Sequence, residues 1–389
     1  MHELLWLLLP VAALSGWWIG RRGRDEAEPE ADGRPLSEAY FQGLNYLLNE
    51  ERDKALEVFT RIVEVDADTV EPHLALGSVF RRRGELDRAI RIHQDLIDRP
   101  SLTRGQRTYA LLALGEDYMK AGVLDRAEEL FQEVVAQDAH VDQALRHLLT
   151  IYEREGEWGS AIATAERLEG IGEGDYRVRI GQLRCEQAAQ AWTDGSADQA
   201  RKTLRRALSA DPGCARANML LGNLEREQGR YKAAMKAYEA IGQQDPALLP
   251  EVLDGLAAAY AGLGRPGRME TFLRDRVARQ PDGRLMVRLA NEVQQRQGAE
   301  PAIRELTWML RRLPSLEGIR RLASLAQSVG EPIGPREVQI LLDLFDKLEA
   351  SRARYRCRQC GFASWTLFWQ CPGCRGWATL RPLSETEGI

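Results

Sequence analysis

A short pattern of small, aromatic and glycine positions recurs through the middle of the chain. A small residue is followed three positions later by an aromatic, seven positions later by glycine and twelve positions later by alanine. Gly115, for example, precedes Tyr118, Gly122 and Ala127. The copies start at Gly43, Gly77, Gly115, Leu149, Ala188, Gly222, Ala257 and Asn291, which are 34, 38, 34, 39, 34, 35 and 34 residues apart.

This period is typical of tetratricopeptide repeats, in which each unit is a pair of antiparallel helices. We therefore predict an all-α superhelical solenoid of about eight repeats over residues 36–315. The small residue lets the two helices approach closely, and we expect the aromatic three positions on to fill the gap between them. The two long spacings place loops near Ser101–Gly105 and Ile171–Gly174. Glycines expected to end the first helices, where φ is positive, are Gly84, Gly122, Gly156, Gly195, Gly229, Gly264 and Gly298.

Two further helices are predicted after the repeats, over residues 316–354. The first spans Leu316–Val329 and the second Arg336–Arg354, with a Gly/Pro-rich turn between them. Apolar residues from Val338 to Leu348 recur at helical spacing on one face of the second helix. This stripe is expected to cap the solenoid or to dock the C-terminal module.

The N-terminus begins with an apolar stretch from Glu3 to Gly20 that carries no charge after its first residue. As a helix it would span about 27 Å, close to the thickness of a bilayer core. Two tryptophans near the end of this stretch would lie at the membrane interface, and the three arginines that follow it place the rest of the chain in the cytoplasm by the positive-inside rule. We predict a transmembrane anchor at residues 1–20 and a cytoplasmic linker at residues 21–35; a buried core helix is the alternative.

Residues 355–389 contain two Cys-x-x-Cys pairs, Cys357/Cys360 and Cys371/Cys374. Two intervening residues let one tight turn direct both sulfurs at a single ion, and two such turns complete a tetrahedral site. Gly361 and the Pro-Gly of the second pair suit these turns. The site is closed to water and substrate, so we interpret the module as a structural, rubredoxin-like zinc ribbon.

We expect one zinc ion in this module, and iron is the alternative because four sulfurs suit either metal. Two disulfides are a further alternative, which a reducing cytoplasm disfavours. A module this small cannot bury a core of its own, so the metal must hold it together. Its surplus aromatics, Trp365, Phe368, Trp369 and Trp377, are expected to pack on the rest of the chain.

The composition disfavours enzymes and nucleic-acid coats. The net charge is −5, whereas a general nucleic-acid-binding surface would be strongly basic. The five histidines form no His-Glu-x-x-His motif, and neither a phosphate-binding loop nor a nucleophile elbow is present. We therefore expect no enzymatic activity. Cys185 and Cys214 stand apart from the ribbon and are expected to be small buried residues.

Six arginines are expected to face the concave side of the solenoid by their position in the repeat. They either form a solvated charged face or line a basic groove for an acidic or extended partner segment. The six are Arg81, Arg146, Arg154, Arg226, Arg288 and Arg296.

The order of these parts, with the start WWIGRR and the ribbon CRQCGF…WQCPGCRGW, resembles the lipopolysaccharide assembly protein B family of Gram-negative bacteria. The resemblance covers essentially the whole chain. It implies a single-pass inner-membrane protein whose body faces the cytoplasm and whose ribbon packs on the repeats. Of the sites, it transfers only the four ribbon cysteines, because the repeat motif encodes packing and leaves partner-facing positions free.

The resemblance also implies a regulatory activity. Members of the family act with the membrane protease FtsH to promote degradation of the deacetylase LpxC, and they contact other envelope assembly proteins. A membrane-tethered RNA-binding or translation-linked factor that uses the basic ribbon is the alternative. We expect protein partners and no nucleic acid, and the sequence leaves a homo-oligomer open.

Overall fold

The computed structural model describes residues 38–65, 69–329 and 353–383 of the chain. They fall into two compact units, Met1–Ala144 and Leu145–Ile389. The predicted anchor, the linker, most of the second capping helix and its apolar stripe lie outside the described residues. Within the described ranges, no helix has both the length and the apolar character needed to cross a bilayer.

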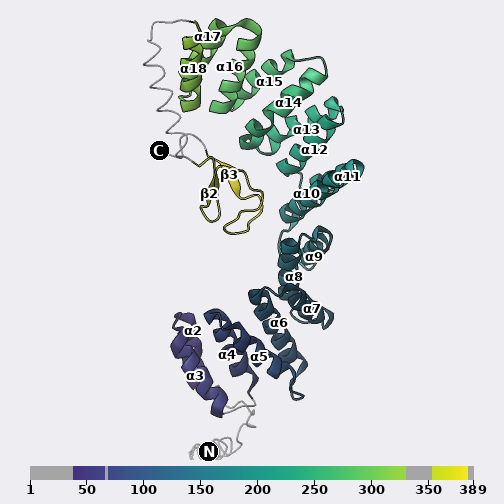
Figure 1. The fold of residues 1–389 in the computed structure, drawn as a ribbon, viewed down its shortest axis with the longest axis vertical. Coiled ribbons are helices and arrows are strands. Elements are labelled where there is room, and N and C mark those ends of the chain that lie inside the picture. Colours follow the sequence, from purple (N-terminus) through teal and green to yellow (C-terminus); the bar gives the residue numbers. More distant parts are fainter. Residues whose placement is uncertain (1–37, 66–68, 330–352, 384–389) are drawn as a thin grey trace, which may run out of the picture. The chain divides into compact units, whose positions relative to one another are not determined.

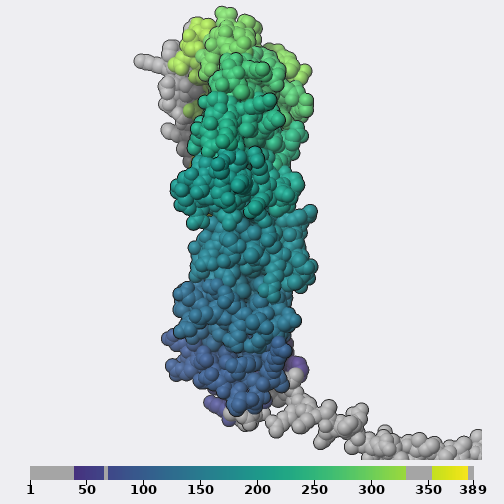
Figure 2. Space-filling view, turned by 90° about the vertical axis from the view of Figure 1, so that its right-hand side faces the viewer, coloured from purple at the N-terminus to yellow at the C-terminus, as the bar shows by residue number. Residues whose placement is uncertain are grey.

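Helices make up almost all of both units (Figure 1). The first unit contains α2 (Glu38–Leu48), α3 (Arg52–Val65), α4 (Val70–Arg83), α5 (Leu86–Ile97), α6 (Arg104–Ala121) and α7 (Leu124–Ala136), and α8 (Val141–Glu155) crosses the boundary. The second contains α9 (Trp158–Gly170), α10 (Arg177–Thr193), α11 (Ala197–Ala210), α12 (Ala215–Glu227), α13 (Tyr231–Gln244), the 3-10 helix η1 (Pro246–Val252), α14 (Leu253–Gly262), α15 (Gly267–Arg279), α16 (Gly283–Gln297), α17 (Ala299–Leu310) and α18 (Leu316–Val329). In the space-filling view, the teal-to-green helices of the second unit pack without a break (Figure 2).

The order of these helices is that of the predicted repeats. Along the described chain they follow one another as eight pairs, from α2–α3 to α16–α17, with α18 after the last pair. The prediction of an all-helical tetratricopeptide solenoid is confirmed. The loop predicted at Ser101–Gly105 ends early, because α6 begins at Arg104. Thr103 and Gln106 form a capping box there, which satisfies N–H groups of the first turn.

The glycines predicted to end the first helices all have positive φ angles. Their φ angles lie between 69° at Gly264 and 94° at Gly298. At Gly122, for example, the N–H groups that end α6 bond to the carbonyls of Tyr118 and Met119. L-amino acids with a Cβ are strained at such φ values, so glycine is the residue that ends these helices at least cost.

In each repeat a side chain of the second helix fills the gap beside the small residue of the first helix. The expectation that this gap is filled by the aromatic residue three positions after the small residue was wrong. A Cβ added to Gly115 on α6 would lie 2.7 Å from the ring of Phe131 on α7, which is fully buried. Phe131 lies sixteen residues after Gly115. The same offset pairs Gly43 with Phe59, Gly77 with His93 and Gly222 with Tyr238.

Repeats without glycine at this position have a smaller partner at the same offset. Ala188 on α10 is followed sixteen residues later by Leu204 on α11, and both belong to one buried cluster. Leu149 on α8 is followed by Ala165 on α9, and both are fully buried. Large side chains therefore face small ones in either order, which keeps the volume between the paired helices nearly constant.

The C-terminal ribbon is a small antiparallel sheet with strand order β2-β1-β3. Its strands are β1 (Tyr355–Cys357), β2 (Ala363–Ser364) and β3 (Leu380–Pro382). Tyr355 lies opposite Ser364 on one side and Pro382 on the other. The buried centre of the ribbon is limited to Tyr355, Cys357, Cys371 and Leu380. So small a centre cannot stabilise the module without further help.

Candidate metal centre

The ribbon brings the four predicted ligand sulfurs into one cluster. The Sγ atoms of Cys357, Cys360, Cys371 and Cys374 all lie within 4.8 Å of one another. The Cys357–Cys374 and Cys360–Cys371 sulfur distances are 3.7 and 3.6 Å. Metal–sulfur bonds of about 2.3 Å in a regular tetrahedron require sulfurs roughly 3.8 Å apart. The cluster therefore already has the dimensions of a four-thiolate site.

The two Cys-x-x-Cys turns are built alike. Gly361 and Arg375, which follow the second cysteine of each pair, have φ angles of 77° and 57°. Each donates its N–H to the carbonyl of the first cysteine of its pair, Cys357 or Cys371, at 3.0 and 2.8 Å. The expectation for Gly361 is confirmed. Arg375 occupies the equivalent position without glycine's freedom, at a cost of about 1–2 kcal/mol.

The surroundings of the cluster favour the thiolate form of Cys357 and oppose that of Cys360. A hydrogen bond with the Thr379 hydroxyl, helped by the N–H groups of Cys360 and Gln359, lowers the pKa of Cys357 to about 6. The N–H of Phe362 favours the Cys360 thiolate, but burial and hydrogen bonds with the other cysteines raise the pKa of Cys360 to about 12. Neighbouring thiolates repel one another, and a bound cation removes that repulsion.

The donor set therefore fits a metal ion, and the ribbon contains a rubredoxin-like four-cysteine metal-binding site. A tetrahedral all-sulfur site accepts zinc or iron. With four protein ligands, no position is left for a water molecule or a substrate. The metal would hold together the two turns that carry the cysteines and, through them, the loops on either side.

Apolar side chains of the ribbon pack on the repeats. Leu367 and Trp369 contact the buried cluster that runs from α12 to α18. The Arg216 guanidinium on α12 lies 5.5 Å from the centroid of the Trp369 ring. Trp365 and Phe368, in the same loop, remain 55% and 39% exposed. One side of this loop thus anchors the ribbon, and the other side faces outward.

Two polar contacts join the ribbon to positions far apart in the solenoid sequence. The indole Nε1 of Trp377 donates to Glu153 Oε1 on α8 at 3.1 Å. Glu153 also accepts hydrogen bonds from Arg179 at 2.7 and 2.9 Å, which fix its carboxylate. Arg381 on β3 forms an ion pair with Asp245, immediately before η1.

A third polar contact uses a carboxylate within η1. Glu251 lies 3.5 Å from Arg354 and 3.0 Å from Arg284 on α16. Burial, followed by a hydrogen bond to Glu251, raises the pKa of Tyr355 to about 12. The described contacts of the ribbon are therefore with α8, η1 and the buried cluster that runs from α12 to α18. The predicted Val338–Leu348 docking stripe lies outside the described residues.

Most of the arginines proposed to line a groove are engaged in ion pairs within the solenoid. Arg288 bonds to Asp254, one repeat earlier, at 2.6 Å, and Arg296 bonds to Glu270 at 2.9 Å. Arg146 forms an ion pair with Glu173. Their charges contribute to the joints between helices, which leaves less positive charge for a partner than the sequence suggested.

Arg81 belongs to a buried network that the sequence did not reveal. It lies 2.7 Å from Asp117 and 2.6 Å from Glu116 on α6. The other oxygen of Asp117 bonds to His93 Nδ1 at 2.5 Å, and both His93 and Asp117 are fully buried. His93 stands where the other glycine-containing repeats have Phe59, Phe131 or Tyr238, and its polar ring is satisfied by Asp117, which Arg81 holds in turn.

The last two predicted groove arginines differ in environment. Arg226 is half-buried, its Nε has no hydrogen-bond partner among the described residues, and it interacts with the Tyr238 hydroxyl. Arg154 is exposed and forms no ion pair within the described part of the chain. Arg154 alone of the six therefore has the free, solvent-facing charge that the groove hypothesis requires.

The ribbon's partners on the solenoid were missed by sequence reasoning. Charged residues make up 29% of the chain. Nothing in the sequence therefore distinguished Glu153, Arg216 and Asp245 from solvated surface residues. The surplus of aromatics in the ribbon was the available signal, and it indicated docking without indicating where. Cys185 and Cys214 are buried as expected, with sulfurs 3.8 Å apart.

Comparison with protein families agrees with this architecture. Residues 73–108, 112–176 and 185–247 match families described as tetratricopeptide repeat. Residues 355–382 match the family described as rubredoxin metal binding domain. A solved structure of the C-terminal part of a repeat protein from Cytophaga hutchinsonii covers 72% of this chain and 98% of its own, at 14% identity and a TM-score of 0.37. Likeness at that level adds nothing to the fold described above.

Full-length relatives are more informative. The lipopolysaccharide assembly protein B of Escherichia coli strain K12 is 38% identical over 390 residues and covers all of both chains. The protein of the same name from Haemophilus influenzae is 34% identical over 399 residues, again with full coverage of both. The similarity thus includes the repeats and the ribbon in one alignment. The chain belongs to the lipopolysaccharide assembly protein B family.

Proposed function

We propose that this protein is an inner-membrane-anchored cytoplasmic adaptor that regulates lipopolysaccharide synthesis. In this proposal it acts with the protease FtsH and promotes degradation of the deacetylase LpxC. The full-length relationship to lipopolysaccharide assembly protein B carries the proposal, because it includes the repeats and the metal ribbon together. The protease and the deacetylase enter through the family resemblance.

The geometry supports an adaptor more than an enzyme. The described helices are joined by packing and ion pairs, and the four-cysteine site has no open coordination position. The buried His93–Asp117 pair is enclosed within α4–α6 and is engaged by Arg81. A solenoid of this kind offers a long surface on which two proteins can bind at once.

The predicted N-terminal anchor would hold this binding surface at the membrane. Apart from Glu3, Ser15 and the indole groups of its tryptophans, the apolar stretch at residues 3–20 has no polar side chain that would recognise a substrate. Its proposed role is to confine the solenoid to the membrane surface. Confinement raises the effective concentration toward a membrane-bound protease without any new contact.

The test is a comparison of the full chain with a variant that lacks residues 1–24, both expressed at the native level. We expect the truncated protein to fold and to leave LpxC long-lived, measured by immunoblot after translation is blocked. A strain without active FtsH is the control, since there the full chain should also leave LpxC stable. Full activity of the truncated protein would refute the tethering argument.

Crosslinking in native membranes, with mass spectrometry, tests the partners directly. We expect the protease and the deacetylase among the crosslinked proteins, with unchanged yield after nuclease treatment. Crosslinks to ribosomal proteins that nuclease abolishes would favour the RNA-binding alternative. That alternative would rely on the exposed arginines of the ribbon, Arg356, Arg358 and Arg375.

A further inference from the structure

A hollow of about 470 Å³ lies where the turn between α12 and α13 meets the end of α14. It is separate from the ribbon contacts described above. We call it the α13 hollow, and its lining residues are Gly229, Arg230, Tyr231, Lys232, Ala233, Lys236 and Leu263. Three of the seven are cations and none is an acid, which is unusual in a chain of net charge −5.

The apolar part of the hollow is held in place by close packing. A Cβ added to Gly262 would lie about 2.6 Å from the ring of Tyr231, so the ring rests directly on the α14 backbone. Leu263 continues the same surface. The aliphatic stems of Lys232 and Lys236 extend it, because lysine keeps only its ammonium group in water. The hollow thus combines an apolar floor with a cationic rim.

The positive charge of the rim is poorly compensated. The Arg230 guanidinium lies 3.7 Å from Glu225, but Glu225 is buried and already pairs with Arg201 at 2.6 Å. Lys232 and Lys236 are exposed and form no ion pair among the described residues. The acid on α13 is Glu239, which accepts a hydrogen bond from the Tyr260 hydroxyl at 2.5 Å.

Further charges on the neighbouring helices do not reverse this balance. Arg265 follows Leu263 in the turn to α15, Arg268 lies in the first turn of α15, and both are exposed. An exposed acid, Glu227, lies in the last turn of α12. The local surface therefore carries an excess of positive charge that only an external anion can balance.

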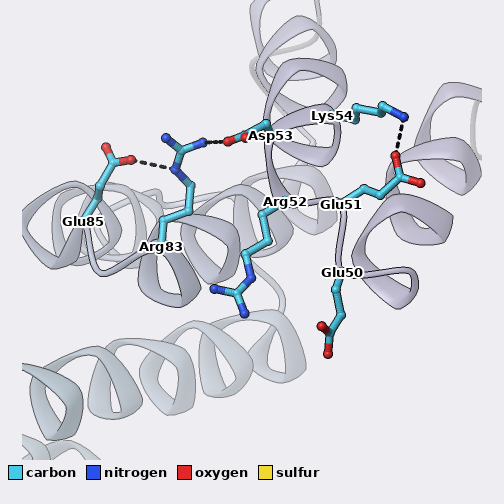
Figure 3. A pocket seen from close by; sticks show the side chains of 7 residues that line it. All are labelled: Glu50, Glu51, Arg52, Asp53, Lys54, Arg83 and Glu85. Carbon is cyan, nitrogen blue, oxygen red and sulfur yellow. Dashed lines mark hydrogen bonds and ion pairs between the residues drawn. The ribbon is translucent and has the colours of Figure 1, made fainter.

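A second hollow, in the first unit, shows the contrast. It has a volume of about 610 Å³ and is lined by four acids and three bases (Figure 3). Five of these seven charges pair with one another: Arg83 pairs with both Asp53 and Glu85, and Lys54 pairs with Glu51. A surface whose charges are paired internally in this way attracts a charged partner only weakly. The α13 hollow differs in this respect.

We propose that the α13 hollow binds an acidic segment of a partner protein. Carboxylates of the segment would face Arg230, Lys232 and Lys236, and an apolar side chain of the segment would contact Tyr231 and Leu263. The apolar floor favours a peptide over a purely ionic ligand, and the acidic whole chain disfavours a long polyanion such as RNA. The proposal builds on the adaptor function and assigns it one docking surface.

The test uses the full chain in detergent and a fluorescein-labelled peptide of four Glu-Glu-Leu repeats. Binding is measured by fluorescence anisotropy at low and high salt. Changing Lys232→Glu together with Lys236→Glu should weaken binding about tenfold or more, since each reversal replaces an attraction by a repulsion. The matched control is Lys202→Glu on α11, an exposed lysine outside the hollow, which should change binding less than about twofold.

Four further measurements decide the outcome. A peptide with Gln in place of Glu should not bind, and Leu263→Ser should weaken binding of the Glu-Glu-Leu peptide. Wild-type affinity weaker than about 1 mM, or equal losses for the double variant and Lys202→Glu, would overturn the proposal. The proposal would also be overturned if the double variant lost binding to phosphatidylglycerol vesicles or to a poly-U strand while its binding of the peptide was unchanged.

The degradation assay separates this proposal from the adaptor function itself. If the double variant binds the peptide normally and LpxC turnover is unchanged, the hollow is not a docking surface while the adaptor function stands. If peptide binding is lost and LpxC is stabilised, the hollow holds a segment needed for turnover. If the full wild-type chain does not affect LpxC turnover, the adaptor function fails independently of the binding result.

Discussion

A single methyl group on Gly115 should disturb the first unit, and a second change should repair the damage. In Gly115→Ala the new Cβ would lie 2.7–2.8 Å from Phe131, so the ring must move by roughly 0.7 Å to reach ordinary contact. Overpacking of this kind costs about 1–3 kcal/mol. Replacing glycine by alanine within a helix returns about 1 kcal/mol. A contact of 2.7 Å is shorter than real Cβ atoms show, which places the overpacking cost in the upper part of its range, so we expect a net loss of about 1–2 kcal/mol.

The repair follows from the pairing of large and small residues in other repeats. Ala188 with Leu204 is the arrangement that Gly115→Ala with Phe131→Leu would reproduce. Phe131→Leu alone leaves a space beside the glycine and should cost about 1–2 kcal/mol. The double variant should lie within about 1 kcal/mol of the wild type, which makes the coupling between the two changes favourable by at least about 1 kcal/mol.

Hydrogen exchange of the α6 and α7 amides is the appropriate assay. Repeat arrays can open in parts, so a single midpoint of thermal unfolding would mix the response of this hairpin with that of its neighbours. Gly105→Ala on the same helix is the control. No atom lies within 4 Å of its new Cβ, so it should be neutral or stabilising. Additive effects of Gly115→Ala and Phe131→Leu, within about 0.5 kcal/mol, would refute the packing argument.

Three other changes test the ribbon and the repeats. Cys374→Ser should abolish tight metal binding, measured as metal per chain by elemental analysis, and should unfold the ribbon while far-UV helicity stays near wild type; one metal per chain in this variant would contradict the four-thiolate site. Arg375→Gly should remove the strain of a left-handed arginine and slow metal loss to a chelator, with stabilisation of about 1 kcal/mol; faster metal loss would show that the arginine side chain matters more than its backbone. Arg154→Glu should slow LpxC turnover without changing thermal stability if the basic-groove hypothesis holds; unchanged turnover would favour the solvated charged face.

The repeats were largely predictable from the sequence because their geometry depends on local rules. Gly84 and Gly122 end helices because few other residues tolerate φ angles near 80°. That requirement appears in the sequence as glycine at a fixed offset. The partner of each small residue was misassigned, because two aromatics recur in the motif. The periodicity alone does not say whether Tyr118 or Phe131 stands opposite Gly115.

The metal ligands were also predictable, because their geometry depends on local rules. The place on the solenoid where the ribbon packs was not predictable. Two Cys-x-x-Cys pairs specify a geometry that is local to two turns. The hydrogen bond from Trp377 to Glu153 joins residues 224 positions apart, and the ion pair of Arg381 with Asp245 spans 136 positions. Neither partner belongs to a motif. Charged surface residues are common, and a single contact of this kind produces no recurring pattern in the sequence.

These distant contacts change what the metal does for the whole second unit. In a solenoid each repeat contacts only its neighbours, so opening at one joint is not opposed by the repeats beyond it. The ribbon contacts α8 through Trp377, α12 through Trp369 and the start of η1 through Arg381. Separation of these helices must therefore break ribbon contacts as well as the joints between repeats. Because the ribbon depends on its four cysteines for its fold, metal loss should remove this restraint and increase exchange in helices that contain no metal ligand. By this route the metal centre would influence the surface that the repeats present to partners, with no need for a partner to touch the metal.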